Sequence, residues 1–224
     1  MYKHFFKRVM DFTITLVGFI LISPIFLVLC ILVRCKLGSP IFFKQVRITK
    51  GDRPFEIIKF RTMTDGRDKD GNLLPDTERF TKFGDFLRNS SLDELPELLN
   101  VLKGDMSLVG PRPLYPKYLP YYTKEENLRH SVRGGITGLA QINGRALCRW
   151  NDRFAYDVKY AKNVSLFNDI RILFRTFFKV AASEDIGTPS VTDEGGLHIL
   201  REVQQPEKVA VVEAINKKYG LNND

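Results

Sequence analysis

An uncharged apolar run dominates the first part of the chain. Residues 12 to 33, FTITLVGFILISPIFLVLCILV, form a stretch of 22 residues, close to the ~20 that a helix needs to cross a bilayer. A cleaved signal peptide has a shorter apolar region and a small-residue cleavage site, whereas Arg34, Cys35 and Lys36 follow this run. The pattern therefore predicts a helix that stays in the membrane.

Two topologies fit this run: a single spanning helix, and a re-entrant hairpin that enters and leaves on one face. Pro24 removes a backbone donor and its ring clashes with the carbonyl of Ile20, which predicts a kink. The hydroxyl of Ser23 is placed to satisfy a freed backbone group. Basic residues, which prefer the cytoplasmic side, lie on both flanks: Lys3, Lys7, Arg8, Arg34, Lys36, Lys44 and Arg47. The break and the two flanks favour the hairpin, with the spanning helix as the alternative.

The pattern then changes to short elements of both kinds. Residues 40 to 63 predict a β-hairpin, because apolar β-formers lie on both sides of a turn at Lys50-Gly51-Asp52. Residues 65 to 79 are polar and rich in turn residues, which predicts a solvated loop rather than a calcium loop. A helical stretch is expected over residues 92 to 102, ending near Lys103-Gly104.

Two further helices are expected toward the C-terminus. In NDIRILFRTFFKV, residues 168 to 180, apolar side chains share one helical face and basic residues recur every fourth position beside it. Such a helix can pack on the core or lie in a membrane interface, and the pattern leaves both placements open. A last helix should begin near Pro206 and stop at Gly220.

Composition narrows the functional classes. The chain has 224 residues, a net charge of +8 and a pI near 9.4, which suggests one or two domains and a polyanionic partner. That partner could be nucleic acid, anionic lipid or a phosphorylated substrate. Three cysteines without a C-x-x-C pair and three scattered histidines argue against a disulfide framework, a cysteine zinc site and histidine-based nucleophilic catalysis. Carboxylates and basic side chains remain for chemistry.

The segment RNSSLDELPELLN, residues 88 to 100, holds an adjacent acid pair, Asp93 and Glu94. One interpretation is structural, because Ser91 and Glu94 fit a capping box and acids are favoured in the first turn of a helix. Pro96 fits this poorly unless the helix begins later or is kinked. The other interpretation is chemical: a helix start should lower the pKa of a carboxylate, and an ionised aspartate can attack phosphorus.

Attack on a pyrophosphate requires cations, because the electrophile is already anionic. Basic side chains that could supply this positive charge lie on both sides of the acid pair in the sequence: Lys59 and Arg61 in KFRTM, Arg88 in FLRNSS, and Arg112 in VGPRP. Each alone is typical of a surface charge. Their grouping around two acids, in a chain with a membrane segment, favours the chemical interpretation.

Long motifs identify a family resemblance. They include KRVMDFTITLVGFILISPIFLVL, F-x-KQ-x-R, KFRTM, FLRNSSLDELPELLNVLKGDMSLVGPRP, GITGLAQINGR and DVKYAKNVSLFNDIRILFRT. The chain resembles the bacterial sugar transferases, the monotopic phosphoglycosyl transferases that act on polyprenyl phosphate. The resemblance covers most of the chain, and its central block is too long and specific for chance. The tail from about residue 183 matches no pattern of this kind.

The resemblance implies an activity and a set of roles. Such enzymes move a sugar 1-phosphate from a UDP-sugar to undecaprenyl phosphate, release UMP, and start the assembly of surface glycans or glycoproteins. They use Mg2+ and a covalent phosphosugar intermediate. The nucleophile maps to Asp93, which is also the expected metal ligand, and Glu94 maps to the second catalytic acid. Lys59, Arg88 and Arg112 match substrate-binding positions that handle phosphates.

The resemblance also implies an architecture. We expect a mixed α/β fold: a compact cytosolic domain with a small antiparallel hairpin and interfacial amphipathic helices, preceded by a re-entrant membrane helix that breaks at Ser23-Pro24. The expected divisions are residues 1–36 for the membrane hairpin, 37–183 for the catalytic domain and 184–224 for an extension that completes it. We expect a minimal form, whereas larger relatives are expected to carry additional helices and a further domain before the membrane hairpin.

Partners and location follow from the same resemblance. We expect the cytoplasmic face of the bacterial inner membrane, with UDP-sugar and undecaprenyl phosphate as substrates and downstream glycosyltransferases as candidate partners. UDP-N-acetylhexosamines or their deoxy-amino derivatives are the expected donors, and the oligomeric state is open. A non-catalytic, membrane-tethered polyanion-binding adaptor is the alternative. A nucleic-acid partner is not expected, because the basic residues flank an acid pair instead of forming a stripe with aromatics.

Overall fold

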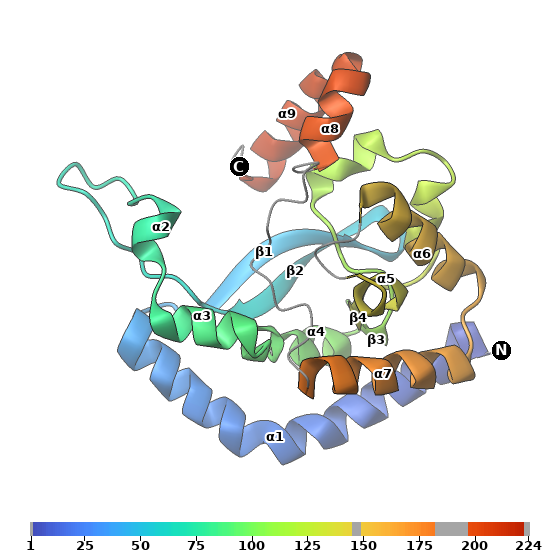
Figure 1. The fold of residues 1–224 in the computed structure, drawn as a ribbon, viewed down its shortest axis with the longest axis horizontal. Coiled ribbons are helices and arrows are strands. Elements are labelled where there is room, and N and C mark those ends of the chain that lie inside the picture. The colour runs from blue at the N-terminus through green and yellow to red at the C-terminus, as the bar shows by residue number, and fades with distance from the viewer. Residues whose placement is uncertain (1, 145–148, 182–196, 222–224) are drawn as a thin grey trace.

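The computed structural model describes residues 2–144, 149–181 and 197–221 as a mixed α/β protein (Figure 1). The predicted domain boundary at 183/184 and Cys148 lie outside the described residues. The strands are β1 (Phe42–Thr49), β2 (Arg53–Phe60), β3 (Ser107–Val109) and β4 (Gly135–Thr137). The helices are α1 (Lys7–Leu37), α2 (Asp76–Arg79), α3 (Lys82–Asn89), α4 (Glu97–Lys103), α5 (Leu139–Ile142), α6 (Trp150–Lys162), α7 (Leu166–Ala181), α8 (Leu197–Gln204) and α9 (Val209–Tyr219).

Helix α1 contains the apolar run and indicates membrane association. In the part of the chain that the structure describes, it is the one helix long and apolar enough to cross a membrane. Only 11% of its most apolar 18-residue window is buried, which argues against a core helix of a soluble protein. The helix is continuous through Pro24 and bends at its middle (Figure 1). Ser23 Oγ donates to the carbonyl of Ile20 at 2.7 Å, the carbonyl that loses its partner at Pro24.

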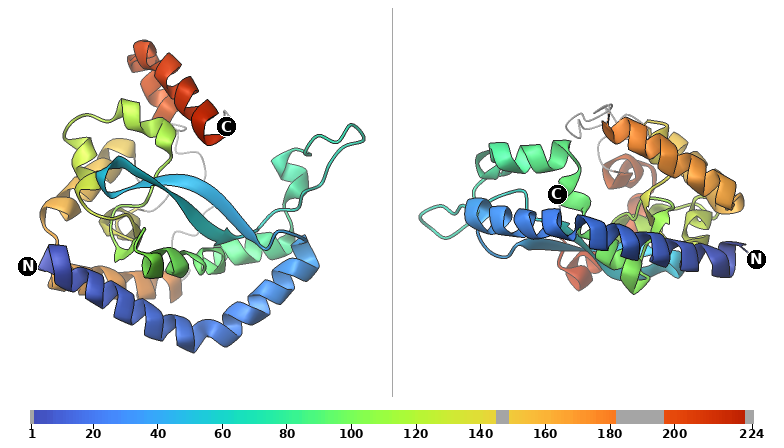
Figure 2. Two further views of the ribbon diagram at one scale, coloured as in Figure 1. Left: turned by 180° about the vertical axis from the view of Figure 1, so that it is seen from behind. Right: turned by 90° about the horizontal axis from the view of Figure 1, so that it is seen from below.

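Both ends of α1 pack on the rest of the protein, and most apolar side chains near its middle are exposed. At the N-terminal end, Arg8 donates to the carbonyls of Val101 (2.5 Å) and Leu102 (2.9 Å). At the C-terminal end, Leu29, Val33 and Leu37 are buried in one apolar cluster with Phe60 of β2 and Leu87 of α3. The apolar side chains between these ends are exposed, and the helix runs across the width of the molecule (Figure 2).

A buried polar network fastens the N-terminal end of α1. Lys7 Nζ lies 2.7 Å from the carboxylate of Asp169 in α7, which also accepts hydrogen bonds from Tyr2 (2.6 Å) and Tyr160 (2.7 Å). One turn further along α1, Asp11 accepts a hydrogen bond from Ser107 Oγ at 2.6 Å. Helix α1 is therefore joined by buried polar contacts to β3 and α7, and through Asp169 to Tyr160 of α6.

The predicted β-hairpin is confirmed. Strands β1 and β2 pair antiparallel, with Thr49 opposite Arg53 and Phe42 opposite Phe60. The turn between them needs positive φ, and Gly51 supplies it at 69° without steric cost. Arg47, which was also counted among the basic flanks of the membrane helix, lies within β1 as the predicted hairpin requires, and it packs on Tyr115.

A second, parallel pair of strands was not predicted. Strands β3 and β4 pair through Ser107 with Gly135 and Val109 with Thr137. The backbones approach so closely that a Cβ on Gly135 would lie 2.1 Å from the amide nitrogen of Gly110. Gly135 N also donates to the carbonyl of Pro111 at 3.0 Å. The glycines of GITG thus hold in place the loop that leads from β3 to Arg112.

The amphipathic segment at residues 168 to 180 is helical, within α7. Its buried face includes Asp169 and Ile172, whereas Phe174, Phe177 and Phe178 are exposed and contact one another edge to face. The exposed aromatic face fits an interfacial helix better than a fully core-packed one. The last predicted helix is also confirmed as α9, which ends at Gly220 with a φ of 60°.

Candidate active site

The acid pair lies in a tight turn between α3 and α4. Ser91 adopts a left-handed backbone (φ 56°), a conformation that costs a non-glycine residue about 1 kcal/mol or more. A single 3₁₀ turn, Leu92–Glu94, follows, and α4 begins after Pro96. The predicted helix at 92–102 is therefore split. The predicted capping box is wrong, because the Ser91 side chain makes no capping hydrogen bond and Glu94 turns away from it.

Glu94 is held by two cations. Its Oε1 lies 2.6 Å from Lys59 Nζ and 2.5 Å from Arg112 Nη2, and its side chain is 23% exposed. Burial alone would raise the pKa of Glu94, but Arg112 and Lys59 outweigh burial and hold that pKa well below its ordinary value. The same carboxylate raises the pKa of Arg112. Glu94 is therefore an ionised anchor for both cations.

Asp93 differs from its neighbour in having no such partner. No hydrogen bond or ion pair to its carboxylate is formed by the described residues. Burial and the charge of Glu94 raise the pKa of Asp93, against the lowering effect of Lys59, Arg112 and Arg88. The expectation that a helix start lowers this pKa is wrong, because Asp93 precedes α4, and partial burial together with the charge of Glu94 raises its pKa. The result is a partly buried carboxyl group among three cations, none of which is bonded to it.

The structure brings together four of the five expected catalytic and binding residues. Lys59 and Arg112 both pair with Glu94, and Asp93 is the neighbour of Glu94 in the chain. Lys59 comes from β2, Arg112 from the loop after β3, and the acids from the turn before α4. Arg88, in the last turn of α3, donates to Thr62 Oγ1 at 2.9 Å and is close enough to affect the pKa of Asp93.

Arg61 lies outside this group, although it follows Lys59 by two residues. It pairs with Asp65 (2.7 Å) and donates to the carbonyl of Ser39 (3.0 Å). These contacts turn it toward the end of α1 and away from the acid pair.

Two buried groups support the site and were missed in the sequence. Asn100 accepts from Ile58 N (3.0 Å) and donates to Glu56 O (2.7 Å), which fixes α4 against the strand that carries Lys59. Arg129 pairs with Asp157 at 2.8 Å and donates to the carbonyl of Arg112 at 2.7 Å. Asn100 lies in an apolar stretch and Arg129 in a polar one, and only their burial and hydrogen bonds reveal their roles.

Glu97 is a third acid beside the same lysine. Its side chain is 1% exposed, and its Oε1 lies 3.2 Å from Lys59 Nζ. Burial and the neighbouring charge of Glu94 raise the pKa of Glu97 to about 7. Lysine 59 therefore lies between a fully ionised glutamate and one that changes its charge near neutrality.

Replacing Glu97 by glutamine should change how stability depends on pH. Because the folded-state pKa of Glu97 lies above its ordinary 4.5, the folded protein holds this proton more tightly than the unfolded chain does. Its contribution to stability is then present below the ordinary pKa and is lost as pH rises toward 7. Thermal unfolding at about pH 5 and about pH 8 should show a smaller loss for Glu97→Gln than for wild type. Equal losses would contradict the assignment.

The carboxylates of the site are suited to bind Mg2+ only together with a bound substrate. Among the described residues, no three His, Cys, Asp or Glu side chains form a cluster that could hold a metal ion. Mg2+ typically takes one or two carboxylates together with substrate phosphates and water. The unbonded carboxylate of Asp93 fits such a site, whereas Glu94 is already engaged by Lys59 and Arg112.

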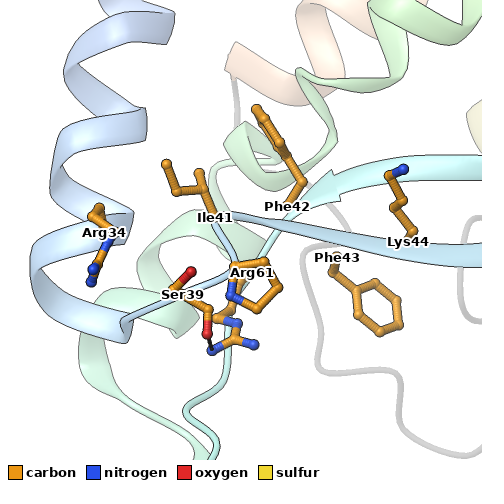
Figure 3. Close-up of a pocket in the computed structure, with 8 residues that line it drawn as sticks. Arg34, Ser39, Ile41, Phe42, Phe43, Lys44 and Arg61 are labelled. Atoms are coloured by element: carbon orange, nitrogen blue, oxygen red, sulfur yellow. Dashed lines mark hydrogen bonds between the residues drawn. The ribbon is translucent and has the colours of Figure 1, made fainter.

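A separate hollow of about 650 Å³ lies beside the end of α1 (Figure 3). Apolar and basic side chains line it together: Arg34, Ser39, Pro40, Ile41, Phe42, Phe43, Lys44 and Arg61. Figure 3 shows Arg34 on the helix and Phe43 and Lys44 on the neighbouring strand. Neither acid of the pair borders this hollow, and two of its cations already face Glu56 and Asp65.

Comparison with known proteins gives the same family throughout. Residues 2–183 match the family described as bacterial sugar transferase. The chain is 54% identical over 180 residues to the uncharacterized sugar transferase EpsL of Bacillus subtilis, covering 80% of this chain and 89% of EpsL. It is 42% identical to the UDP-glucose:undecaprenyl-phosphate glucose-1-phosphate transferase of Klebsiella pneumoniae, over 78% of this chain and 40% of that enzyme.

A further relative differs in its named sugar. The chain is 38% identical to the UDP-N-acetylgalactosamine-undecaprenyl-phosphate N-acetylgalactosaminephosphotransferase of Aeromonas hydrophila, over 77% of this chain and 43% of that enzyme. The chain thus spans less than half the length of these two named enzymes, and nearly the full length of EpsL. On the family match and the identity to EpsL, the chain belongs to the bacterial sugar transferase family.

Proposed function

We propose that this chain transfers a sugar 1-phosphate from a UDP-sugar to undecaprenyl phosphate, with release of UMP. The observation that carries the proposal is the contrast between two adjacent acids. Glu94 neutralises Lys59 and Arg112, while Asp93 stays unbonded among the same cations. Such a carboxylate is available to react, and the names of relatives sharing about 40% identity supply the substrate class.

The proposed reaction takes place in two displacements. A carboxylate oxygen of Asp93 attacks the β-phosphorus of the donor, and the bond from that phosphorus to the bridging oxygen breaks. UMP leaves with the bridging oxygen and its electron pair, and the sugar phosphate remains on Asp93. An oxygen of undecaprenyl phosphate then attacks the same phosphorus, and the Asp93 carboxylate leaves as an anion.

The surrounding residues have distinct tasks in this scheme. Lys59 and Arg112 offset negative charge on the phosphoryl group in transfer, and Glu94 keeps both of them in place between the two steps. Arg88 lies within electrostatic reach of the same carboxylate. Mg2+ bound through Asp93 and the donor phosphates would supply further charge neutralisation.

We also propose that α1 is re-entrant and that the protein is monotopic, on the cytoplasmic face of the bacterial inner membrane. Three observations support this: the bend at Pro24, the exposed apolar middle of α1, and the packing of both its ends on one domain. A straight helix of 31 residues would measure about 46 Å and would place its two ends on opposite sides of the bilayer. The exposed phenylalanines of α7 are suited to the same interface.

The direct test of function is a panel of UDP-sugars, with undecaprenyl phosphate and magnesium present, assayed for UMP release and for a lipid-linked sugar diphosphate. The panel should include UDP-glucose, UDP-N-acetylglucosamine and UDP-N-acetylgalactosamine, because named relatives differ in their sugar. Both products are expected with one donor. UMP release from no donor in the panel would favour the membrane-tethered adaptor.

The topology can be tested by cysteine labelling. In a background without the native cysteines, neither Phe5→Cys nor Lys217→Cys should react with an impermeant reagent in intact cells, and both should react after permeabilisation. Both positions are exposed and lie on either side of the apolar run. Labelling of Phe5→Cys alone in intact cells would establish a single spanning helix. Adding Pro24→Ala should move part of the population toward that outcome, because it removes the cause of the bend.

A further inference from the structure

Arg47 is a largely buried arginine without a carboxylate partner. Its guanidinium lies 3.5 Å from the centroid of the Tyr115 ring, and its Nη2 donates to Gln45 Oε1 at 2.6 Å. Its Nε is buried and has no hydrogen-bond partner. Among the described residues, no Asp or Glu lies within ion-pair distance of it, whereas Lys59, Arg112 and Arg129 each have one. The positive charge of Arg47 is therefore not compensated inside the protein.

The charges around Arg47 make this arrangement more costly. Burial lowers the pKa of Arg47 and the nearby charge of Arg112 lowers it further, whereas Tyr115 and Tyr118 raise it without reversing the direction. The ammonium of the buried Lys117 lies 5.6 Å from the centroid of the same Tyr115 ring. Burying an uncompensated charge is strongly unfavourable, and arginine is well suited to a planar, two-point contact with a phosphate. An anionic ligand would supply both the missing charge and the missing acceptor.

The position of Arg47 relative to the acid pair indicates which phosphate this is. Ile48 N donates to the carbonyl of Leu114 at 3.0 Å, and Arg47 stacks on Tyr115, so Arg47 packs on the short segment that follows Arg112. Arg112 itself pairs with Glu94, the chain neighbour of Asp93. Arg112 therefore links Arg47 to the acid pair. A diphosphate with its β-phosphorus at Asp93 would extend its α-phosphate past Arg112 toward Arg47.

We propose that Arg47, supported by the ring of Tyr115, binds the α-phosphate of the nucleoside diphosphate-sugar and stabilises the nucleoside monophosphate as it leaves. This inference rests on the proposed function. When the β-phosphorus is transferred to Asp93, the bridging oxygen stays on the α-phosphate with the bonding electrons, and that phosphate gains one negative charge. Arg47 faces this developing charge and has no task in the second displacement, in which no nucleotide takes part.

The two half-reactions can be measured separately. In the first, UDP-sugar is added without acceptor, and the formation of the phosphosugar adduct and UMP is followed. In the second, protein loaded to completion is freed of nucleotide, and transfer to undecaprenyl phosphate is measured. Arg47→Gln should slow the first by about ten- to a hundredfold and weaken inhibition by UMP to a similar degree. It should leave the second unchanged, which also shows that the variant is folded.

Two further variants sharpen the test. Arg47→Lys should recover only part of the first half-reaction, because an ammonium replaces the two-point contact and the ring stacking. Arg53→Gln removes the same charge from the exposed start of β2, where the side chain is 63% exposed, and should change neither half-reaction. Equal losses in both half-reactions of Arg47→Gln, or a loss in the second alone, would overturn the proposal.

Direct binding of UMP separates this proposal from the proposed function. Titration calorimetry with UMP should show binding to wild type and to Arg53→Gln, and binding at least about tenfold weaker to Arg47→Gln. Undiminished UMP binding by Arg47→Gln would refute the role of Arg47 and leave the enzyme assignment intact. If wild type neither binds UMP nor forms an adduct with any donor in the panel, the proposed function itself fails.

Discussion

Replacing Asp93 by asparagine should abolish the covalent adduct and reduce turnover by at least about three orders of magnitude. Asparagine keeps the size and hydrogen-bonding capacity of the side chain but is not a nucleophile toward phosphorus. The loss should come without unfolding, because the described residues make no hydrogen bond or ion pair to the Asp93 carboxylate. Intact-protein mass spectrometry after incubation with donor and magnesium, without acceptor, measures the adduct.

The matched control is Asp65→Asn, which removes an acid that pairs with Arg61 outside the site. It should retain the adduct. A phosphosugar mass that persists on Asp93→Asn would place the nucleophile elsewhere.

The pH dependence of the first half-reaction should report the same group. Asp93 must be ionised to attack, and burial raises its pKa above the ordinary 3.8. The rate should therefore fall as pH decreases through a pKa higher than that of a solvent-exposed aspartate.

Replacing Glu94 by glutamine should reduce turnover by about a hundredfold or more while leaving the nucleophile in place. Glu94 pairs with Lys59 and Arg112 at 2.6 and 2.5 Å, and a hydrogen bond to a charged group typically contributes about 1.5 to 3 kcal/mol. Lys59 would keep Glu97 at 3.2 Å, whereas Arg112 would lose its carboxylate partner, turn to Asp93 and make it a poorer nucleophile. Steady-state kinetics should show the loss, and prolonged incubation with donor should still yield the adduct.

The control for Glu94 is Glu56→Gln, because Glu56 is exposed and makes only a surface pair with Lys44. It should leave turnover within about twofold of wild type, since such pairs contribute little. A Glu94→Gln enzyme that also stays within about twofold would show that Lys59 and Arg112 need no anchor.

Local sequence rules predicted those parts of the fold that depend on local geometry. The β1–β2 turn follows from Lys50-Gly51-Asp52, where a positive φ is required, and α9 follows from a first-turn proline and a closing glycine. The bend in α1 follows from Pro24, and the Ser23 hydroxyl serves the backbone as expected. The strands β3 and β4 were missed because three residues are too few to show an alternation.

The electrostatics of the site depend on burial, which the linear sequence does not show. A helix start was expected to lower the pKa of Asp93, but partial burial and the charge of Glu94 raise it. Arg47 was grouped with the basic flank of the membrane helix because it follows Arg34, Lys36 and Lys44 after the apolar run. Its contact with Tyr115, a residue 68 positions later in the chain, forms only in the folded protein. The same is true of its separation from carboxylates.

The fastening of α1 also has a consequence for the order of biosynthesis. Lys7 leaves the ribosome 162 residues before its partner Asp169, roughly 8 to 30 seconds at bacterial elongation rates. During that interval the apolar helix meets the bilayer, while Ser107, Tyr160 and Asp169 have yet to emerge. Lys7 and Asp11 lie one turn apart, 3.7 Å between charged atoms, so they can compensate each other during that time. Asp11 thus serves as the counter-ion of Lys7 in the nascent helix until Asp169 has been synthesised.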